Sequence, residues 1–286
     1  MVRTTSPAAT PRPAPVAAVA FAYAAGSYRF VVTTEATIEL TADSGSRAET
    51  RTTVAQLGYR IGAGTSGIRT ITGVVDSFTV TATAGSPSAV IAAPVTFRGT
   101  LDPARRIVNL QPSVAAPVSS DCGSPNQLLF ALVREAIVVP PSPLKVGQTW
   151  EDSATTTICR GDVPLTTRTL HRYTVAGAVL YEGAEAMHLT RASTIALGGE
   201  GSQRGVGLVV AGQGASSADL FLDPTAGRFL GGLSESDVEL TVTTPERGPQ
   251  RFRQRTRTRI ETAPLSGRES GARTRPKAGT SGQRRK

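Results

Sequence analysis

Alternation of hydrophobic and polar residues runs along most of the chain and predicts β-strands. Tyr28 to Thr34 begins such a run, which continues to Leu40, and a turn cluster at 43–46 separates it from a second run over 47–61. Both runs are rich in threonine and valine, whose branched side chains suit a pleated sheet better than a helix. Further extended segments are predicted at 68–83, 149–160, 166–181, 184–197, 205–213 and 217–223.

Two hairpins share an Asp-Pro turn. Residues 95–110 alternate around Leu101-Asp102-Pro103, and Leu222-Asp223-Pro224 precedes a second return strand. Proline presets φ and aspartate bonds the following backbone, which favours a turn. The two Asp-Pro pairs lie 121 residues apart, and the same offset relates the first strand run to the run that begins at Thr149. The sequence therefore predicts a mainly β protein with curved antiparallel sheets in two similar halves, which an internal duplication would explain.

One segment, near 125–138, has helical spacing. Ser124-Pro125 fits a helix cap followed by proline at the first helical position, and three prolines between 140 and 143 end the pattern. We expect one prominent helix that packs on a face of the sheet. Its apolar face would consist of Leu128, Leu129, Leu132, Val133 and Ile137.

These patterns divide the chain into five segments. The two ends are polar and rich in proline or arginine, and the strand-rich parts lie on either side of the helical segment. The proposed segments are a signal-like or disordered N-terminus (1–26), an N-terminal β half (27–120), a helix and proline-rich connector (121–148), a C-terminal β half (149–263) and a disordered basic tail (264–286).

The positive charge is concentrated at the ends of the chain. The net charge is +9, but residues 264–286 contain seven arginines and lysines against one glutamate, and residues 27–263 are nearly neutral. The core therefore gives no reason to expect sequence-specific nucleic-acid binding. By charge alone the tail could contact an anionic polymer or a membrane surface, and the alternative is a solvated tail without a partner.

The compartment is inferred from the N-terminus and the cysteines. Residues 16–25 are short, uncharged and rich in alanine, and Ala22-Tyr23-Ala24 fits a signal-peptidase site. The alternative is a disordered linker. Cys122 and Cys159 are the only cysteines, and an even number in an exported protein favours a disulfide, worth about 4 kcal/mol by loop entropy. Two separate buried thiols are the other interpretation. Together these features favour an extracytoplasmic protein, either periplasmic or secreted.

Five arginines recur at every second position between Arg251 and Arg259, so in a strand they share one face. Such a row could bind a polyanion. The alternative is an ion-paired outer face at a sheet edge, because pairing Thr243 with Arg251 would place three carboxylates opposite three of the arginines. In that register Arg251 and Arg253 lack partners, and they are the candidate anion contacts.

Motifs of known chemistry are absent from the sequence. There is no Gly-x-Ser-x-Gly elbow, no His-Glu-x-x-His zinc motif and no phosphate loop. His171 and His188 are interpreted as structural or surface residues. Glu151 and Asp152 are adjacent, so on a strand they face opposite sides and cannot form a carboxylate pair. We therefore expect a non-catalytic protein with no metal, no cofactor and no titratable groups converging inside the fold. An enzyme whose site cannot be recognised from the sequence is the remaining alternative.

The arrangement resembles uncharacterised exported bacterial β-rich proteins and lipoproteins with two similar halves. The residues of this resemblance are the two Leu-Asp-Pro hairpins, at 101–103 and 222–224, and Pro-Leu-Lys-Val-Gly-Gln-Thr-Trp at 143–150. The predicted curved sheet is also similar to the lipoprotein-carrier half-barrels, in which a helix covers an apolar concave face. That resemblance implies a lipid or another hydrophobic ligand. The chain lacks the lipobox cysteine of the lipoproteins.

We therefore expect a non-catalytic envelope or periplasmic protein that binds a lipid or other hydrophobic small molecule between sheet and helix. The alternative function is an adhesion or assembly module that uses a sheet edge and the basic tail to contact an anionic partner. Ordinary core packing is the competing interpretation for every candidate lining residue. The candidates are Leu128, Leu132 and Val133 on the helix and Phe30, Phe97, Trp150 and Phe221 on the sheet.

Overall fold

The computed structural model describes most of the chain between its two ends. Cys122 and Leu128 lie outside the described residues, and so does the side chain of Cys159, so the disulfide stays a prediction. The described ranges are 18–42, 45–64, 68–82, 89–90, 94–102, 107–113, 132–160, 163–203 and 205–263.

The described residues form twelve β-strands, which confirms a mainly β protein. Most strands are long, and their burial alternates along the sequence, as in β12. The strands are β1 (Gly26–Ala42), β2 (Gly45–Ile61), β3 (Arg69–Ala82), β4 (Ala89–Val90), β5 (Val95–Asp102), β6 (Ile107–Pro112), β7 (Thr149–Arg160), β8 (Val163–Tyr181), β9 (Ala184–Gln203), β10 (Val206–Asp223), β11 (Arg228–Thr244) and β12 (Gly248–Thr262).

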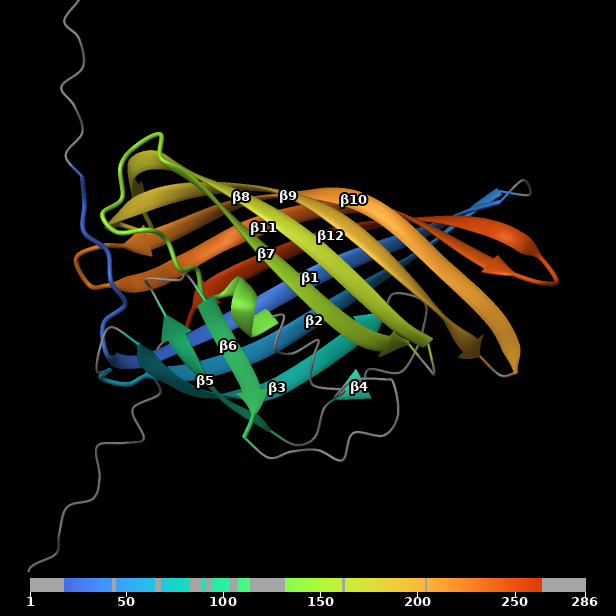
Figure 1. Ribbon diagram of the computed structural model, residues 1–286, viewed down its shortest axis with the longest axis horizontal. Coiled ribbons are helices and arrows are strands. Elements are labelled where there is room, and N and C mark those ends of the chain that lie inside the picture. The colour runs from blue at the N-terminus through green and yellow to red at the C-terminus, as the bar shows by residue number, and fades with distance from the viewer. Residues whose placement is uncertain are drawn as a thin grey trace, which may run out of the picture.

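All twelve strands belong to one antiparallel sheet. Its order is β6-β5-β3-β2-β1-β12-β11-β10-β9-β8-β7, with β4 paired to β3. The first and last strands pair directly, from Phe30↔Thr262 to Thr41↔Arg251. The sheet is strongly curled into a half-barrel, with β7 and β8 crossing in front of β1 and β2 (Figure 1). The β1–β12 pairing joins the strands of both predicted halves into this single curled sheet, and no duplication is shown.

The helix ends at 135, before the end that the sequence predicts, and residues 125–131 of the predicted span lie outside the described residues. Only residues 132–135 are helical among those described, and 136–138 of the expected 125–138 span have left the helix. The last bonds, Ala136 N to Val133 O and Ile137 N to Arg134 O, span three residues and tighten the end of the helix. Beyond them, the backbone N of Val138 donates to Tyr23 Oη over 3.1 Å. This tertiary contact replaces a helical bond, so the apolar pattern at 136–138 belongs to an extended connector.

Residues 18–25, which the sequence analysis assigns to a signal-like or disordered end, pack into the fold. Val19 bridges to Leu144 through two backbone hydrogen bonds. The side chains of Phe21 and Tyr23 are buried in the main core. Removal of residues up to Ala24 would take two aromatic side chains out of that core. The packing therefore favours retention of this segment in the folded protein.

The core occupies one end of the half-barrel. Phe30 lies within 5.6 Å of Tyr59 and 5.8 Å of Phe229, measured between ring centroids, and all three are buried. The connector contributes further buried residues to this core, among them Val133 and Leu144. No helix in the described part of the chain has the length and apolar character needed to cross a membrane. A smaller apolar cluster, Val163, Leu165 and Val210, lies toward the other ends of β8 and β10.

Candidate functional site

A row of polar side chains crosses the inner face of six neighbouring strands, between the two apolar clusters. Asp152 of β7 pairs in register with His171 of β8, which pairs with Ser193 of β9. The register continues through three further hydroxyl residues on β10, β11 and β12. These are Ser216, Ser236 and Thr256.

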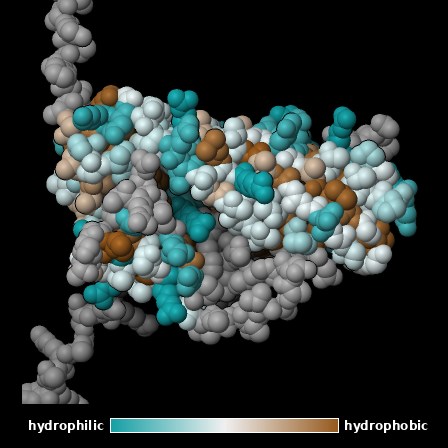
Figure 2. Space-filling model, viewed as in Figure 1, coloured by the Kyte–Doolittle hydropathy of each residue, from teal (hydrophilic) through white to brown (hydrophobic). Residues whose placement is uncertain are grey.

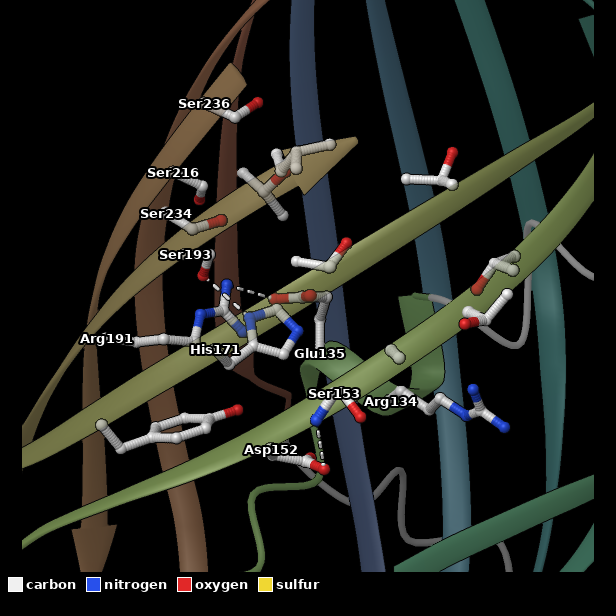
Figure 3. Close-up of a pocket in the computed structure, with 18 of the residues that line it drawn as sticks. Arg134, Glu135, Asp152, Ser153, His171, Arg191, Ser193, Ser216, Ser234 and Ser236 are labelled. Atoms are coloured by element: carbon white, nitrogen blue, oxygen red, sulfur yellow. Dashed lines mark hydrogen bonds and ion pairs between the residues drawn. The ribbon is translucent and has the colours of Figure 1, made fainter. Parts of the chain in front are cut away.

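This polar row lines a cavity of about 490 Å³ between the sheet and the 132–139 segment. Glu135 points from the short helix toward Arg191 and His171, whereas Arg134 points to the other side of the helix (Figure 3). The apolar part of the lining is aliphatic and consists of Ile137, Val139, Ile158 and Ile195, together with the alanine at 154. The cavity therefore combines a polar floor with an aliphatic wall.

A buried ion pair lies at the centre of the site. Arg191 Nη2 donates to Glu135 Oε2 over 2.7 Å, and the two side chains are 5% and 30% exposed. Burial opposes the charge of Arg191, yet Glu135 raises the pKa of Arg191 above its usual range. Burial alone would also raise the pKa of Glu135, but the charge and hydrogen bond of Arg191 lower it overall. Both groups are therefore charged near neutral pH, and each depends on the other.

His171 and Ser193 form the second polar contact. His171 Nδ1 lies 2.8 Å from Ser193 Oγ, and both side chains are buried. Burial lowers the pKa of His171, Arg191 lowers it further, and Glu135 and Asp152 oppose the shift. The imidazole is therefore neutral near neutral pH. It can accept a proton from a neighbouring hydroxyl.

Tyr173 connects the polar site to the aromatic core. Its ring stacks on Trp150 with a centroid separation of 4.9 Å, and burial raises the pKa of Tyr173 to about 12. The charge of Arg191 opposes this rise. The Nε of Arg191 is buried and has no hydrogen-bond partner in the described structure. A buried donor without an acceptor is costly, so a bound acceptor atom would be favoured there.

The hydrophobic candidates from the sequence analysis do not line this cavity. Phe30, Phe97, Val133 and Trp150 are buried core residues, and Leu132 is partly buried against the same core. The lining contains none of these side chains. They belong to the main core beside the cavity, and the cavity itself is more polar than the sequence predicts.

Phe221 lies on the opposite face of the sheet from the other candidates. Leu220 next to it is buried in the core, whereas Phe221 stacks between Tyr181 and His188 at centroid distances of 4.0 and 5.1 Å. His188 Nε2 also lies 2.7 Å from Asp219 Oδ1. The placement of Phe221 inside the sheet–helix space is therefore wrong. The alternation of a strand puts it outside.

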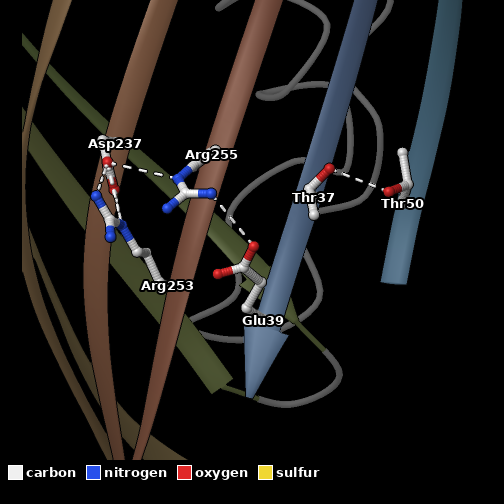
Figure 4. Close-up of polar contacts among 6 residues, drawn as sticks. All are labelled: Thr37, Glu39, Thr50, Asp237, Arg253 and Arg255. Carbon is white, nitrogen blue, oxygen red and sulfur yellow. Dashed lines mark hydrogen bonds and ion pairs between the residues drawn. The ribbon is translucent and has the colours of Figure 1, made fainter. Parts of the chain in front are cut away.

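The arginine strand, β12, is central in the sheet, not at its edge, and its register differs by two residues from the expected one. Asp237 pairs with Arg255 and Glu239 with Arg253. Arg253 Nε donates to Asp237 Oδ1 over 2.9 Å, so the argument that Arg253 lacks a partner is wrong. Arg255 bridges Asp237 and Glu39 of β1 (Figure 4). The expected ion-paired outer face is present, and its carboxylates come from both neighbouring strands.

Several large hydrophobic side chains are exposed on the surface, among them Leu180 and Val209. In the view of Figure 2, hydrophobic residues appear as patches separated by pale and hydrophilic ones. The described residues contain no group of three or more His, Cys, Asp or Glu side chains that could bind a metal ion. The inner cavity is therefore the best-formed candidate site.

Sequence reasoning missed the members of this site because they are far apart in the chain. Glu135, His171 and Arg191 come from the short helix, β8 and β9, and only strand pairing brings them together. One signal was available. The runs that contain Asp152, His171 and Ser193 are consecutive strands, and polar residues at inward positions of such strands are unusual.

Comparison with known proteins gives only distant structural similarity. No protein-family model matches the chain, and no curated protein is similar to it. The chain is similar to DynF from the dynemicin biosynthesis pathway of Micromonospora chersina, with 10% identity, a TM-score of 0.28 and coverage of 91% of each chain. OccK2 (OpdF) of Pseudomonas aeruginosa, in complex with glucuronate, has 6% identity and a TM-score of 0.31 over 82% of this chain and 98% of the other.

A domain described as an outer membrane lipoprotein-sorting protein, from Vibrio parahaemolyticus, is also similar. It has 10% identity and a TM-score of 0.17 over 85% of this chain and 88% of the other. The resemblance to lipoprotein carriers is thus limited to a distant similarity of curled antiparallel sheets. All three TM-scores are too low to support an argument about function, which is therefore drawn from the site alone.

Proposed function

We propose that the protein is an extracytoplasmic binding protein that holds a small amphipathic molecule on the inner face of its half-barrel. The observation that supports this most directly is the cavity of about 490 Å³ between the 132–139 segment and β7–β12. Ligand pockets for small molecules are commonly of this size, with an apolar lining and a few polar groups that orient the ligand.

The lining favours a ligand that has both an apolar and a polar part. Ile137, Ile158 and Ile195 offer an aliphatic surface to a hydrocarbon chain. The hydroxyl groups of the polar row and the unpartnered Nε of Arg191 offer hydrogen bonds to a polar group. A purely hydrocarbon ligand would leave these polar groups unsatisfied, at a cost of about 1–3 kcal/mol each. The proposed ligand is therefore a lipid-like molecule with a hydrogen-bonding head group.

The extracytoplasmic location rests on sequence features. The two cysteines support it. The alanine-rich N-terminal segment does not add to this support, because Phe21 and Tyr23 within it are buried in the core, which favours its retention rather than its removal. Free-thiol titration of the denatured, unreduced protein distinguishes the alternatives. Export predicts no reactive thiol, and two reactive thiols would remove the main support for export.

The binding proposal is tested by placing a bulky side chain on the inner face of β10, where it would fill the cavity, and the same side chain on the outer face as a control. Ser216 faces the cavity, and its neighbour Ser217 is exposed on the outer face of β10. We expect Ser216→Phe to abolish binding of a dansyl-labelled fatty acid, because the added ring occupies the cavity. Ser217→Phe introduces the same side chain outside and should bind like the wild type.

Native mass spectrometry of gently purified protein provides the second measurement. A lipid-sized adduct in the wild type and in Ser217→Phe, but absent from Ser216→Phe, is the expected result. Urea unfolding of both variants checks that each is folded. Equal binding by the two folded variants, or no adduct and no fatty-acid binding by the wild type, would contradict the proposal.

A further inference from the structure

The polar row contains a hydroxyl paired with a base, which the proposed binding function does not use. Ser193 Oγ and His171 Nδ1 lie 2.8 Å apart on neighbouring strands, and both residues line the cavity. This separation lies within the range expected for a nucleophile and its general base. Asp152 is in register with His171 on the other side, so the three residues cross β7, β8 and β9 in the order acid, base and hydroxyl.

A donor for a developing oxyanion is present in the same cluster. Arg191 is 5% exposed, its Nη2 is held by Glu135, and its Nε is buried without a partner in the described structure. Arg191 and Ser193 are two positions apart on β9 and share its inner face. A fixed donor in a site shielded from water stabilises an oxyanion more strongly than the same donor would in water.

We propose that this cavity is an esterase site in which Ser193 is the nucleophile, His171 the general base and Arg191 the oxyanion donor. The substrate class is a carboxylic ester with an apolar acyl chain, which the aliphatic wall of Ile137, Ile158 and Ile195 would accommodate. The inference goes beyond ligand binding, although it rests on the same cavity.

The steps need only the substrate and water. Ser193 Oγ attacks the carbonyl carbon, its proton passes to His171 Nδ1, and the carbonyl oxygen takes up the negative charge beside Arg191. Collapse breaks the ester C–O bond, and the leaving alkoxide takes the proton from His171. Water then attacks the acyl-serine with His171 again as base, which releases the carboxylic acid and restores the serine hydroxyl. The balance is ester plus water to acid plus alcohol.

The charges around His171 are consistent with this role. Glu135 on the helix, Asp152 on β7, and Arg191 and Tyr173 on the adjoining positions are the titratable groups that face it. Burial and Arg191 together lower the pKa of His171, so the base form persists below the usual midpoint of histidine. Esterase activity should therefore rise with pH to a plateau that begins below about pH 6.5.

The experiment uses the folded, full-length protein with a decyl fluorophosphonate probe and p-nitrophenyl octanoate. We expect one equivalent of probe on the peptide that contains Ser193. Labelling should be absent from Ser193→Ala, and hydrolysis should fall by at least about 10²-fold in His171→Gln. Ser217→Ala is the matched control, because Ser217 is an exposed hydroxyl on the outer face of β10 and does not line the cavity.

The outcomes separate this inference from the binding proposal. Ser193→Ala should bind the dansyl-labelled fatty acid more weakly but measurably, because Arg191 and the other hydroxyls of the polar row remain. Equal labelling of Ser193→Ala and wild type, or no labelling of wild type that binds the fatty acid, would overturn the esterase assignment and leave binding intact. If the wild type reacts with the probe but does not bind the fatty acid, the binding proposal is contradicted and the esterase assignment is not.

Discussion

Breaking the buried ion pair should cost far more than breaking an exposed one. Arg191→Leu would leave Glu135 charged and without a partner in a mostly buried position. Removal of one partner of a buried pair typically costs about 3–5 kcal/mol. Because the Glu135 side chain retains 30% exposure, we expect a value near the lower limit, about 3 kcal/mol at pH 7.

The assay is urea unfolding followed by the fluorescence of Trp150, the only tryptophan, which stacks on Tyr173 beside the site. Arg257→Leu is the control, because Arg257 pairs with Glu235 across 3.5 Å and both side chains are more than 60% exposed. That variant should change the unfolding free energy by no more than about 0.5 kcal/mol. A cost for Arg191→Leu below about 1 kcal/mol, or equal to that of Arg257→Leu, would refute the reasoning.

The pH dependence gives a second check on the same variant. Arg191 lowers the pKa of Glu135 in the folded wild type. The ion pair therefore contributes its full stability above the pKa that Glu135 has in the unfolded chain. This contribution is lost as the pH falls through the lower pKa of Glu135 in the folded protein. In Arg191→Leu, burial raises the pKa of Glu135 and favours its neutral form, opposed only by the nearby His171. The difference between the two proteins should therefore shrink as the pH falls from 7 to about 4.

Three further predictions follow from core packing, backbone contacts and titration. Phe30→Ala should lower the free energy of unfolding in urea by about 3–5 kcal/mol. Phe221→Ala, on the outer face, should lower it clearly less, and equal losses would contradict the assigned faces. Gly214→Ala should destabilise the protein by about 1–3 kcal/mol, because the added Cβ would meet the backbone carbonyl of Asp237. Gly207→Ala should not destabilise it, because no atom lies near the position of its Cβ. Equal stabilities of the two variants would argue against the β10–β11 register. In an NMR titration, His171 should have a pKa below the usual histidine value because of its burial, and a normal or raised value would show that the residue is solvated.

Much of the fold was accessible from local sequence patterns. The alternation of polar and apolar residues in β1, β2 and β12 and the Asp-Pro turn after β10 identified real strands and a real hairpin. The opposite orientation of Glu151 and Asp152 also follows from the strand period alone. These features depend on residues that are close in the sequence, so they can be predicted without knowledge of the tertiary structure.

The features that sequence analysis missed depend on long-range pairing. The β1–β12 contact makes the arginine strand central, and it brings Glu39 to Arg255 across more than two hundred residues of chain. The helix ends early because Val138 bonds Tyr23. The candidate site joins Glu135, His171 and Arg191 through strand register. Periodicity places a side chain on a face, but register decides which side chain lies beside it.

A crystal structure of the protein with a bromine-labelled single-chain amphiphile would show whether and how the cavity holds a ligand. We expect anomalous bromine density inside the half-barrel, near Ile158 and Ile195, with the polar end of the molecule at Arg191 and Ser193. Bromine density only on the outer face, or an amphiphile oriented with its polar end away from Arg191, would contradict this expectation.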